Sequence, residues 1–258
     1  MKHIKKFEDE SSLISYKKSN FVTPHVYLDA NLNEVQYMET YIPLEYISST
    51  STGGQYIDLG CQLLENTDDI QLDIKFNITG HGKSSTGQST LIASQIEINP
   101  YPGFTLRGSA DNPIKYVELM TKWMCSNDWI SFNDGGKQRY CYKYIATQKQ
   151  QVTDAGGQLC SPNEIHEYSI LLDQIPASQV NNTTCTLFCA LNGSNQPFRF
   201  ITADLYYLKI TKGGQVIRNL IPVKRVSTQE VGLYDIENDH LYTSQGDSPF
   251  VAGPINNI

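Results

Sequence analysis

The sequence predicts an all-β protein built as an antiparallel β-sandwich. Three observations predict it: short apolar runs alternate with turn-forming residues, one run alternates strictly between apolar and polar residues, and no segment has a sustained helical period. The strictly alternating run extends from Ile70 to Ile78, where every second residue is apolar, as in a strand with one face toward a core. Many short strands with turns between them indicate a sandwich or a jelly roll.

Predicted strands follow one another from residue 44 to residue 243. Turn-forming residues separate them, including Lys212-Gly213-Gly214, which predicts a tight hairpin, and Glu237-Asn238-Asp239. Phe198, Phe200 and Tyr206 are expected to follow an inward-facing rhythm, although less regularly than the run from Ile70. The predicted strands are residues 44–47, 55–59, 70–78, 89–98, 103–107, 116–123, 129–132, 139–146, 166–172, 184–190, 199–210, 215–222, 231–236 and 240–243.

Residues 1–45 are predicted to form a separate strand-rich leader that anchors the protein, and residues 46–258 form the sandwich domain. Apolar residues flank a turn former at residues 31–33, which predicts a hairpin. A hairpin alone is marginally stable, so this one is expected to pair with another surface by strand addition. The residues expected to contact the partner are Phe21, Val22, Val26, Val35 and Tyr37.

Composition argues against several classes of partner. The formal net charge is −7, and no basic stripe is present, so no nucleic-acid partner is expected. No apolar run approaches the ~18 residues of a membrane span, and the first residues have no apolar signal-peptide core. We therefore expect synthesis in a cytoplasm and no membrane partner.

The cysteines and the Asn-x-Ser/Thr sequences are expected to have structural roles. The six cysteines lack zinc-site spacing, so neither a metal nor a cofactor is expected. Cys185 and Cys189 are predicted to lie on the same face of one strand, as small buried hydrophobes. The Asn-x-Ser/Thr sequences are interpreted as turn residues; they begin at Asn77, Asn181, Asn182 and Asn192.

No catalytic constellation is recognisable in the chain. A glycoside hydrolase needs two carboxylates, one to protonate the leaving oxygen and one to attack or to activate water. Glu97 is the single candidate on a suitable strand, and no carboxylate follows it at two or four residues. No Gly-x-Ser-x-Gly elbow surrounds a serine. We therefore expect a protein without enzyme activity.

An aromatic cluster in the middle of the chain is the candidate ligand site. Tyr140, Tyr142 and Tyr144 alternate, so their rings are expected on one face of a strand. Such rings pack in cores and at subunit interfaces, or they form a platform for sugar rings; both interpretations stay open. The candidate residues are Trp123, Trp129, Tyr140, Tyr142, Tyr144, Asp128 and Asp134, the two carboxylates being placed to bind hydroxyl groups.

Two segments of the sequence resemble a known family. The first comprises residues 46–50 and 54–60, which include Gln55-Tyr56-Ile57-Asp58-Leu59-Gly60, with Leu59 where the family usually has Thr. The second runs from Ile221-Pro222-Val223 through Val231-Gly232-Leu233-Tyr234-Asp235 to Thr243. Both resemble the opening and closing strands of the concanavalin-like (laminin-G-like) β-sandwich in virion proteins of gut Bacteroidales phages, including crAss-like phages. The resemblance spans residues 46–253, and Cys61 to Leu208 fit it only as a generic series of strands.

This resemblance implies a role in a virus particle. The expected function is that of a non-enzymatic virion structural protein, most simply a head-associated decoration, auxiliary capsid or head-fibre protein. The alternative is a tail-associated receptor- or glycan-binding module. The partners implied are other virion proteins, further copies of this chain in a homo-oligomer, and a surface glycan. The implied location is the virion.

Overall fold

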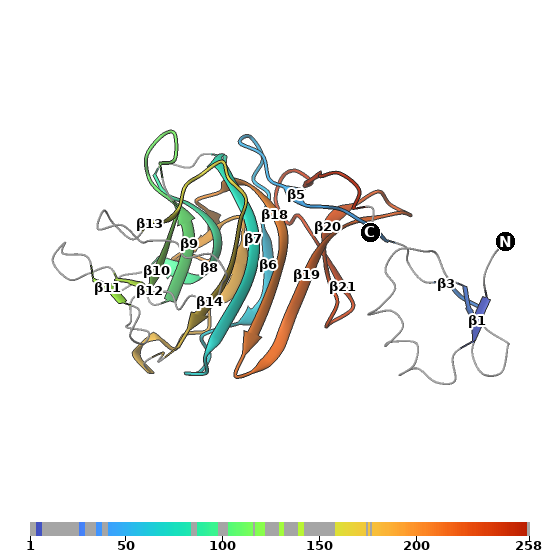
Figure 1. Ribbon diagram of the computed structural model, residues 1–258, viewed down its shortest axis with the longest axis horizontal. Coiled ribbons are helices and arrows are strands. Elements are labelled where there is room, and N and C mark those ends of the chain that lie inside the picture. The colour runs from blue at the N-terminus through green and yellow to red at the C-terminus, as the bar shows by residue number, and fades with distance from the viewer. Residues whose placement is uncertain are drawn as a thin grey trace.

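The computed structural model confirms the all-β prediction (Figure 1). It describes residues 4–6, 26–28, 35–37, 41–83, 87–97, 103–115, 117–121, 129–131, 139–141, 158–173, 175 and 177–256. The described residues form strands and a single 3-10 turn, η1 (Ala177–Gln179). None of their helical segments has the length and apolar character needed to span a membrane.

One layer of the sandwich, sheet I, has nine strands. Six of its strands pair in the order β14-β7-β18-β19-β20-β21, and β4, β5 and β22 pair along β18 and β19 or with one another. The bounds are β4 (Tyr41–Pro43), β5 (Ile47–Ser48), β7 (Ile70–His81), β14 (His166–Leu172), β18 (Ile201–Lys212), β19 (Gln215–Arg225), β20 (Val231–Asp235), β21 (His240–Thr243) and β22 (Val251–Ala252).

The other layer, sheet II, has ten strands in the order β11-β12-β10-β9-β8-β15-β6, with β13, β16 and β17 attached at its sides. Its pairs are antiparallel except for β16 beside β8. The bounds are β6 (Ile57–Gln62), β8 (Ser89–Glu97), β9 (Gly103–Gly108), β10 (Val117–Thr121), β11 (Trp129–Ser131), β12 (Arg139–Cys141), β13 (Gln158–Cys160), β15 (Thr184–Leu187), β16 (Ala190–Asn192) and β17 (Pro197–Phe198).

The two sheets pack face to face around one apolar core. The inward residues of β7 and β18 in sheet I meet those of β8, β9 and β15 in sheet II, and all belong to a single buried cluster. The predicted alternation from Ile70 to Ile78 is confirmed, because every second side chain of β7 is buried. Burial of these side chains is the main term that holds the layers together.

The inward rhythm predicted for Phe198, Phe200 and Tyr206 is wrong. All three are only partly buried. The strand begins at Ile201, so the inward positions are Ile201 and the alternate residues after it. A bulge between Leu205 and Tyr207 then shifts the phase, which leaves two successive tyrosines facing outward.

The strand predicted over residues 184–190 is broken, so its two cysteines do not share one continuous strand. Phe188 has a φ of +64°, a left-handed backbone that ends β15 and turns the chain toward β16. Its amide donates to Leu91 O at 2.7 Å, and its ring packs against Phe250 with centroids 4.9 Å apart. Cys185 and Cys189 are nevertheless both buried free thiols, as expected.

The predicted hairpins are present. Gly213 and Gly214, with φ of +53° and +78°, form the two-residue turn between β18 and β19, because such a turn needs positive φ at both positions. In the leader, β2 (Val26–Leu28) pairs antiparallel with β3 (Val35–Tyr37), as predicted. A third strand, β1 (Ile4–Lys6), adds to β2 in parallel and was not predicted.

The end of the predicted leader lies in the sandwich. β4 pairs with β19, and Leu44 is 4% exposed in the apolar core. The division of the chain at residue 45 stays a prediction, and these contacts place the last residues of the leader with sheet I.

Candidate functional site

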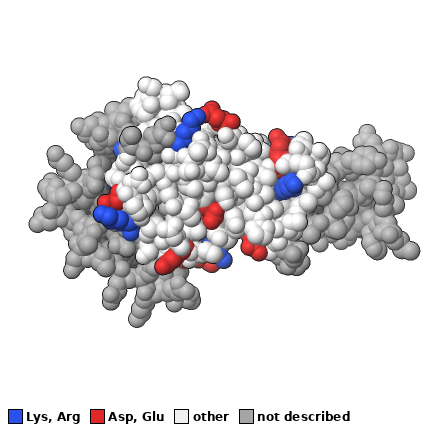
Figure 2. Space-filling model, turned by 90° about the horizontal axis from the view of Figure 1, so that it is seen from above, with Lys and Arg blue, Asp and Glu red and all other residues white. Residues whose placement is uncertain are grey.

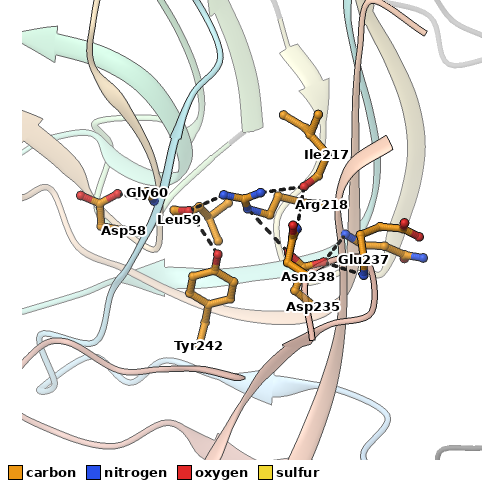
Figure 3. A network of polar contacts seen from close by, with 10 residues as sticks. Asp58, Leu59, Gly60, Ile217, Arg218, Asp235, Glu237, Asn238 and Tyr242 are labelled. Carbon is orange, nitrogen blue, oxygen red and sulfur yellow. Dashed lines mark hydrogen bonds and ion pairs between the residues drawn. The ribbon is translucent and has the colours of Figure 1, made fainter. Parts of the chain in front are cut away.

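The opening and closing segments of the sandwich lie against each other (Figure 3). Arg218 on β19 donates from Nη2 to the backbone oxygen of Leu59 on β6 at 2.9 Å. The hydroxyl of Tyr242 on β21 donates to the same oxygen at 3.2 Å. Since β6 belongs to sheet II and the other two strands to sheet I, these bonds tie the two layers together at the edge of sheet II.

A buried carboxylate organises the sheet I side of this contact. The side chain of Asp235 is 0% exposed; its Oδ1 accepts the amides of Asn219 at 3.0 Å and Glu237 at 3.1 Å. Its Oδ2 accepts Nδ2 of Asn238 at 2.6 Å and lies 3.7 Å from Nε of Arg218. A buried charge needs such compensation, so this network is structural and fixes the β20–β21 turn.

A pocket of about 320 Å³ opens beside the outer edge of β6. Ile57 and Leu59 point into the core, so the intervening Asp58 and the preceding Tyr56 face outward and form its floor. The walls come from the start of β15, the β16–β17 hairpin and the segment after β21. The lining residues are Tyr56, Asp58, Asn182, Thr183, Thr184, Leu191, Asn195, Pro197 and Gln245.

The walls of the pocket are fixed by side chains that bind backbone groups. Asn181 Oδ1 accepts the amide of Thr183 at 2.9 Å, and Asn192 Oδ1 accepts the amides of Ser194 and Gln196, each at 2.9 Å. On the edge of β6, Gln245 Oε1 accepts the amide of Asp58 at 3.0 Å. A pocket held in this way keeps its shape without a ligand, which reduces the entropy lost on binding.

These hydrogen bonds test the prediction that the Asn-x-Ser/Thr sequences are turn residues. The interpretation is confirmed for Asn181 and Asn192. It is wrong for Asn77, which lies within β7 and donates to Asp204 Oδ2 at 3.3 Å. Asn182 is exposed and lines the pocket.

The pocket presents several polar groups. Asp58 accepts the amide of Gly60 at 2.8 Å and the hydroxyl of Thr184 at 2.9 Å, and a carboxylate has further lone pairs to offer. Burial raises the pKa of Tyr56, and the neighbouring Cys189 and Asp58 raise it further, so its hydroxyl is a donor at neutral pH. The Thr183 side chain is buried, and its Oγ1 has no hydrogen-bond partner among the described residues.

The aromatic cluster predicted from the sequence is only partly within the described residues. The backbones of Trp129 and Tyr140 lie in the paired strands β11 and β12, where Trp129 is opposite Cys141 and Tyr140 is opposite Ile130. The rest of the cluster lies outside the described residues: Trp123, Asp128, Asp134, Tyr142 and Tyr144. The platform therefore stays a prediction.

Three of the predicted anchor residues lie in the leader sheet. Val26 on β2 is opposite Tyr37 on β3, and Val35 on β3 is opposite Leu28. Phe21 and Val22 lie outside the described residues. Within the described chain, the outer strands β1 and β3 each pair on one side, with β2. Their contact with a partner stays a prediction.

Charge and metal-binding groups give no second site in the described part of the chain. Figure 2 shows basic and acidic side chains interspersed on one face of that part, without a basic stripe on the face. No group of three His, Cys, Asp or Glu side chains among the described residues could hold a metal ion.

Comparison with known proteins identifies no relative: no family model, curated protein or solved structure matches the chain.

Proposed function

We propose that the protein is a non-enzymatic structural component of a bacteriophage particle, attached to the head as a decoration, auxiliary capsid or head-fibre protein. The observation that carries the proposal is that the chain combines a sandwich around an apolar core with a small leader sheet, whose outer strands β1 and β3 pair only with β2 among the described residues. The resemblance of residues 46–50, 54–60 and 221–243 to phage virion sandwiches suggests that this combination is used in a phage particle.

The leader sheet supplies the means of attachment. A strand edge presents unpaired backbone N–H and C=O groups, to which a strand of another protein can add. Within the described part of the leader, the edges of β1 and β3 that face away from β2 have no paired strand and offer such rows. Apolar residues at Val26, Val35 and Tyr37 would add burial to backbone pairing on a capsid protein or on another copy of the chain.

The sandwich supplies a stable body for display. Its core joins both sheets, and its opening and closing segments are bound to each other by Arg218 and Tyr242 through Leu59. The net charge of −7 opposes non-specific association of the displayed domains. A tail-associated glycan-binding module is the second candidate function, and the preformed pocket beside β6 favours it.

Replacement of Tyr27 by proline tests the attachment. Tyr27 is the middle residue of β2 and lies opposite both Lys5 on β1 and Gln36 on β3. Proline has no N–H and disrupts a central strand, so the leader sheet should not form. We expect Tyr27→Pro to be absent from particles when it complements a phage that lacks this gene, while thermal unfolding of the sandwich is unchanged.

Tyr27→Phe is the matched control, because it keeps the amide and an aromatic ring. It should be incorporated as the wild type is, as measured by quantitative mass spectrometry of purified particles. Incorporation of Tyr27→Pro at the wild-type level would contradict attachment through the leader sheet.

A further inference from the structure

We propose that the outer edge of β14 pairs with the same edge of a second copy of this chain, antiparallel about a two-fold axis at Ser169. The two copies of sheet I would then form one continuous sheet. This surface is separate from the leader sheet that carries the proposed function. Three properties support the pairing: the length of the free edge, its exposure, and the match of its sequence to itself.

β14 is the longest strand in the described part of the chain that pairs on one side only. In Figure 1 it lies at the edge of sheet I beside β7. Its seven residues all pair with that strand, from His166 opposite Phe76 to Leu172 opposite Ile70. On its other side, where no described strand pairs, backbone N–H and C=O groups form a row to which another strand can add.

Other edges among the described residues of the sandwich carry features that oppose such pairing. β22 has two residues and lies between Pro249 and Pro254, and β21 has four residues. At the edge of β6, Gly60 has a φ of +63°, and Gln245 already accepts the amide of Asp58. By contrast, β14 contains neither Pro nor Lys, the residues that commonly block an edge.

The start of β14 is open to solvent. Ile165, directly before the strand, is 55% exposed, and the side chain of Glu167 is 59% exposed. A single exposed isoleucine is common on protein surfaces. Here it adjoins a free strand edge, so a second molecule can approach the edge and cover apolar surface as the backbones pair.

Two-fold symmetry restricts the register of the pairing. When position i faces position j of the second copy, j also faces i. Residues opposite each other lie on the same face of the sheet, so the axis must pass at a residue and not between two. Ser169 is the middle residue of β14, and an axis there pairs the whole strand. An axis at Tyr168 or Ile170 would leave two residues of β14 unpaired at one end.

In the register centred on Ser169, the strand matches itself in charge and in residue type. On the outer face, Glu167 is opposite Leu171 of the second copy, so the carboxylates of the two copies do not face each other. The charge of Glu167 is compensated within its own chain by Lys75, whose Nζ lies 3.7 Å from Oε2. On the inner face, Tyr168 is opposite Ile170 of the second copy, an aromatic and β-branched pair of the kind that stabilises antiparallel sheets.

Sedimentation equilibrium of the full-length chain tests the pairing, with two substitutions at one outward-facing, partly exposed residue of β14, Leu171. Leu171→Glu places a carboxylate opposite Glu167 of the second copy at two symmetric positions. It should weaken the dimer by about tenfold or more, because like charges directly opposite each other destabilise a strand pair. Leu171→Lys places an ammonium group there and should dimerise at least as tightly as the wild type.

Two controls separate association through β14 from folding and from the leader. Both Leu171 variants add one charge at the same position, so both should keep the circular dichroism spectrum of the wild type. Tyr27→Pro, in which the leader sheet should not form, should still dimerise.

Three outcomes would overturn the proposal. The first is a chain that is monomeric at about 100 μM, where a dimer with a Kd of about 10 μM is mostly formed. The second is a dimer of Leu171→Glu as tight as that of Leu171→Lys. The third is loss of the dimer in Tyr27→Pro, which would place the interface in the leader sheet. None of them decides whether the chain is found in particles, so the two proposals fail separately.

Discussion

Replacement of Asp235 by alanine is expected to lower the free energy of unfolding by about 3–5 kcal/mol, the usual cost of removing one partner from a buried charged network. The substitution leaves the amides of Asn219 and Glu237 without their acceptor. It also removes the acceptor of Asn238 and the carboxylate beside Arg218, whose side chain is only 15% exposed. The cost is therefore that of several groups that lose their acceptor at once, not of one ion pair.

Urea denaturation followed by intrinsic fluorescence measures this effect. Asp69→Ala, at an exposed aspartate in the loop before β7, is the control and should change stability by less than about 0.5 kcal/mol. The loss of stability for Asp235→Asn should lie between those of Asp235→Ala and Asp69→Ala. Its amide oxygen can still accept the backbone N–H groups of Asn219 and Glu237, but its amide nitrogen cannot replace the oxygen that accepts from Asn238. A loss below about 1 kcal/mol for Asp235→Ala, the size of an ordinary substitution, would show that the network does not hold the closing turn.

Replacement of Gly246 by alanine is expected to cost about 3 kcal/mol, at the upper end of typical overpacking. A Cβ at this position would lie 1.7 Å from the backbone oxygen of Gly54 and 2.7 Å from its carbonyl carbon. Neither atom can rotate away, so the closing segment must move off the opening one. The movement would strain the bond from the amide of Gln245 to Tyr56 O, which is 2.9 Å long.

Gly80→Ala is the matched control for this substitution. Gly80 lies in β7, and the nearest atom to an added Cβ is Thr202 Cβ at 3.9 Å, an ordinary contact. Thermal unfolding and hydrogen exchange should show a lower melting temperature and faster exchange at Gln245 for Gly246→Ala alone. Equal stability of the two variants would mean that the opening and closing segments are not packed as the structure has them.

The sequence predicts the sandwich because burial imposes a period of two on its strands, and β7 displays that period from Ile70 to Ile78. The predictions fail where the backbone departs from regular geometry. The bulge in β18 shifts the inward positions by one residue, and the positive φ of Phe188 ends the strand that the sequence predicts over residues 184–190. Neither event has a local sequence marker, since tertiary packing determines both.

The pocket beside β6 is harder to predict from the sequence than the fold is. Three parts of the chain far apart in sequence line the pocket: residues 56–58, residues 182–197 and Gln245. They meet only because β6, β15, the β16–β17 hairpin and the segment after β21 converge. The Asn-x-Ser/Thr sequences at Asn181 and Asn192 marked the turns that build its walls, and they could have pointed to it. The unpaired hydroxyl of Thr183 depends on its surroundings, so no residue pattern predicts it.

Immunogold electron microscopy of purified phage particles, with antibodies raised against this chain, tests the proposed function most directly. We expect gold label distributed over the head, since the leader sheet would attach each copy to the shell and leave the sandwich outward. Label confined to the tail would contradict attachment to the head and favour the glycan-binding module. Particles that carry no label, from a phage that encodes and expresses the chain, would contradict its role in the virion.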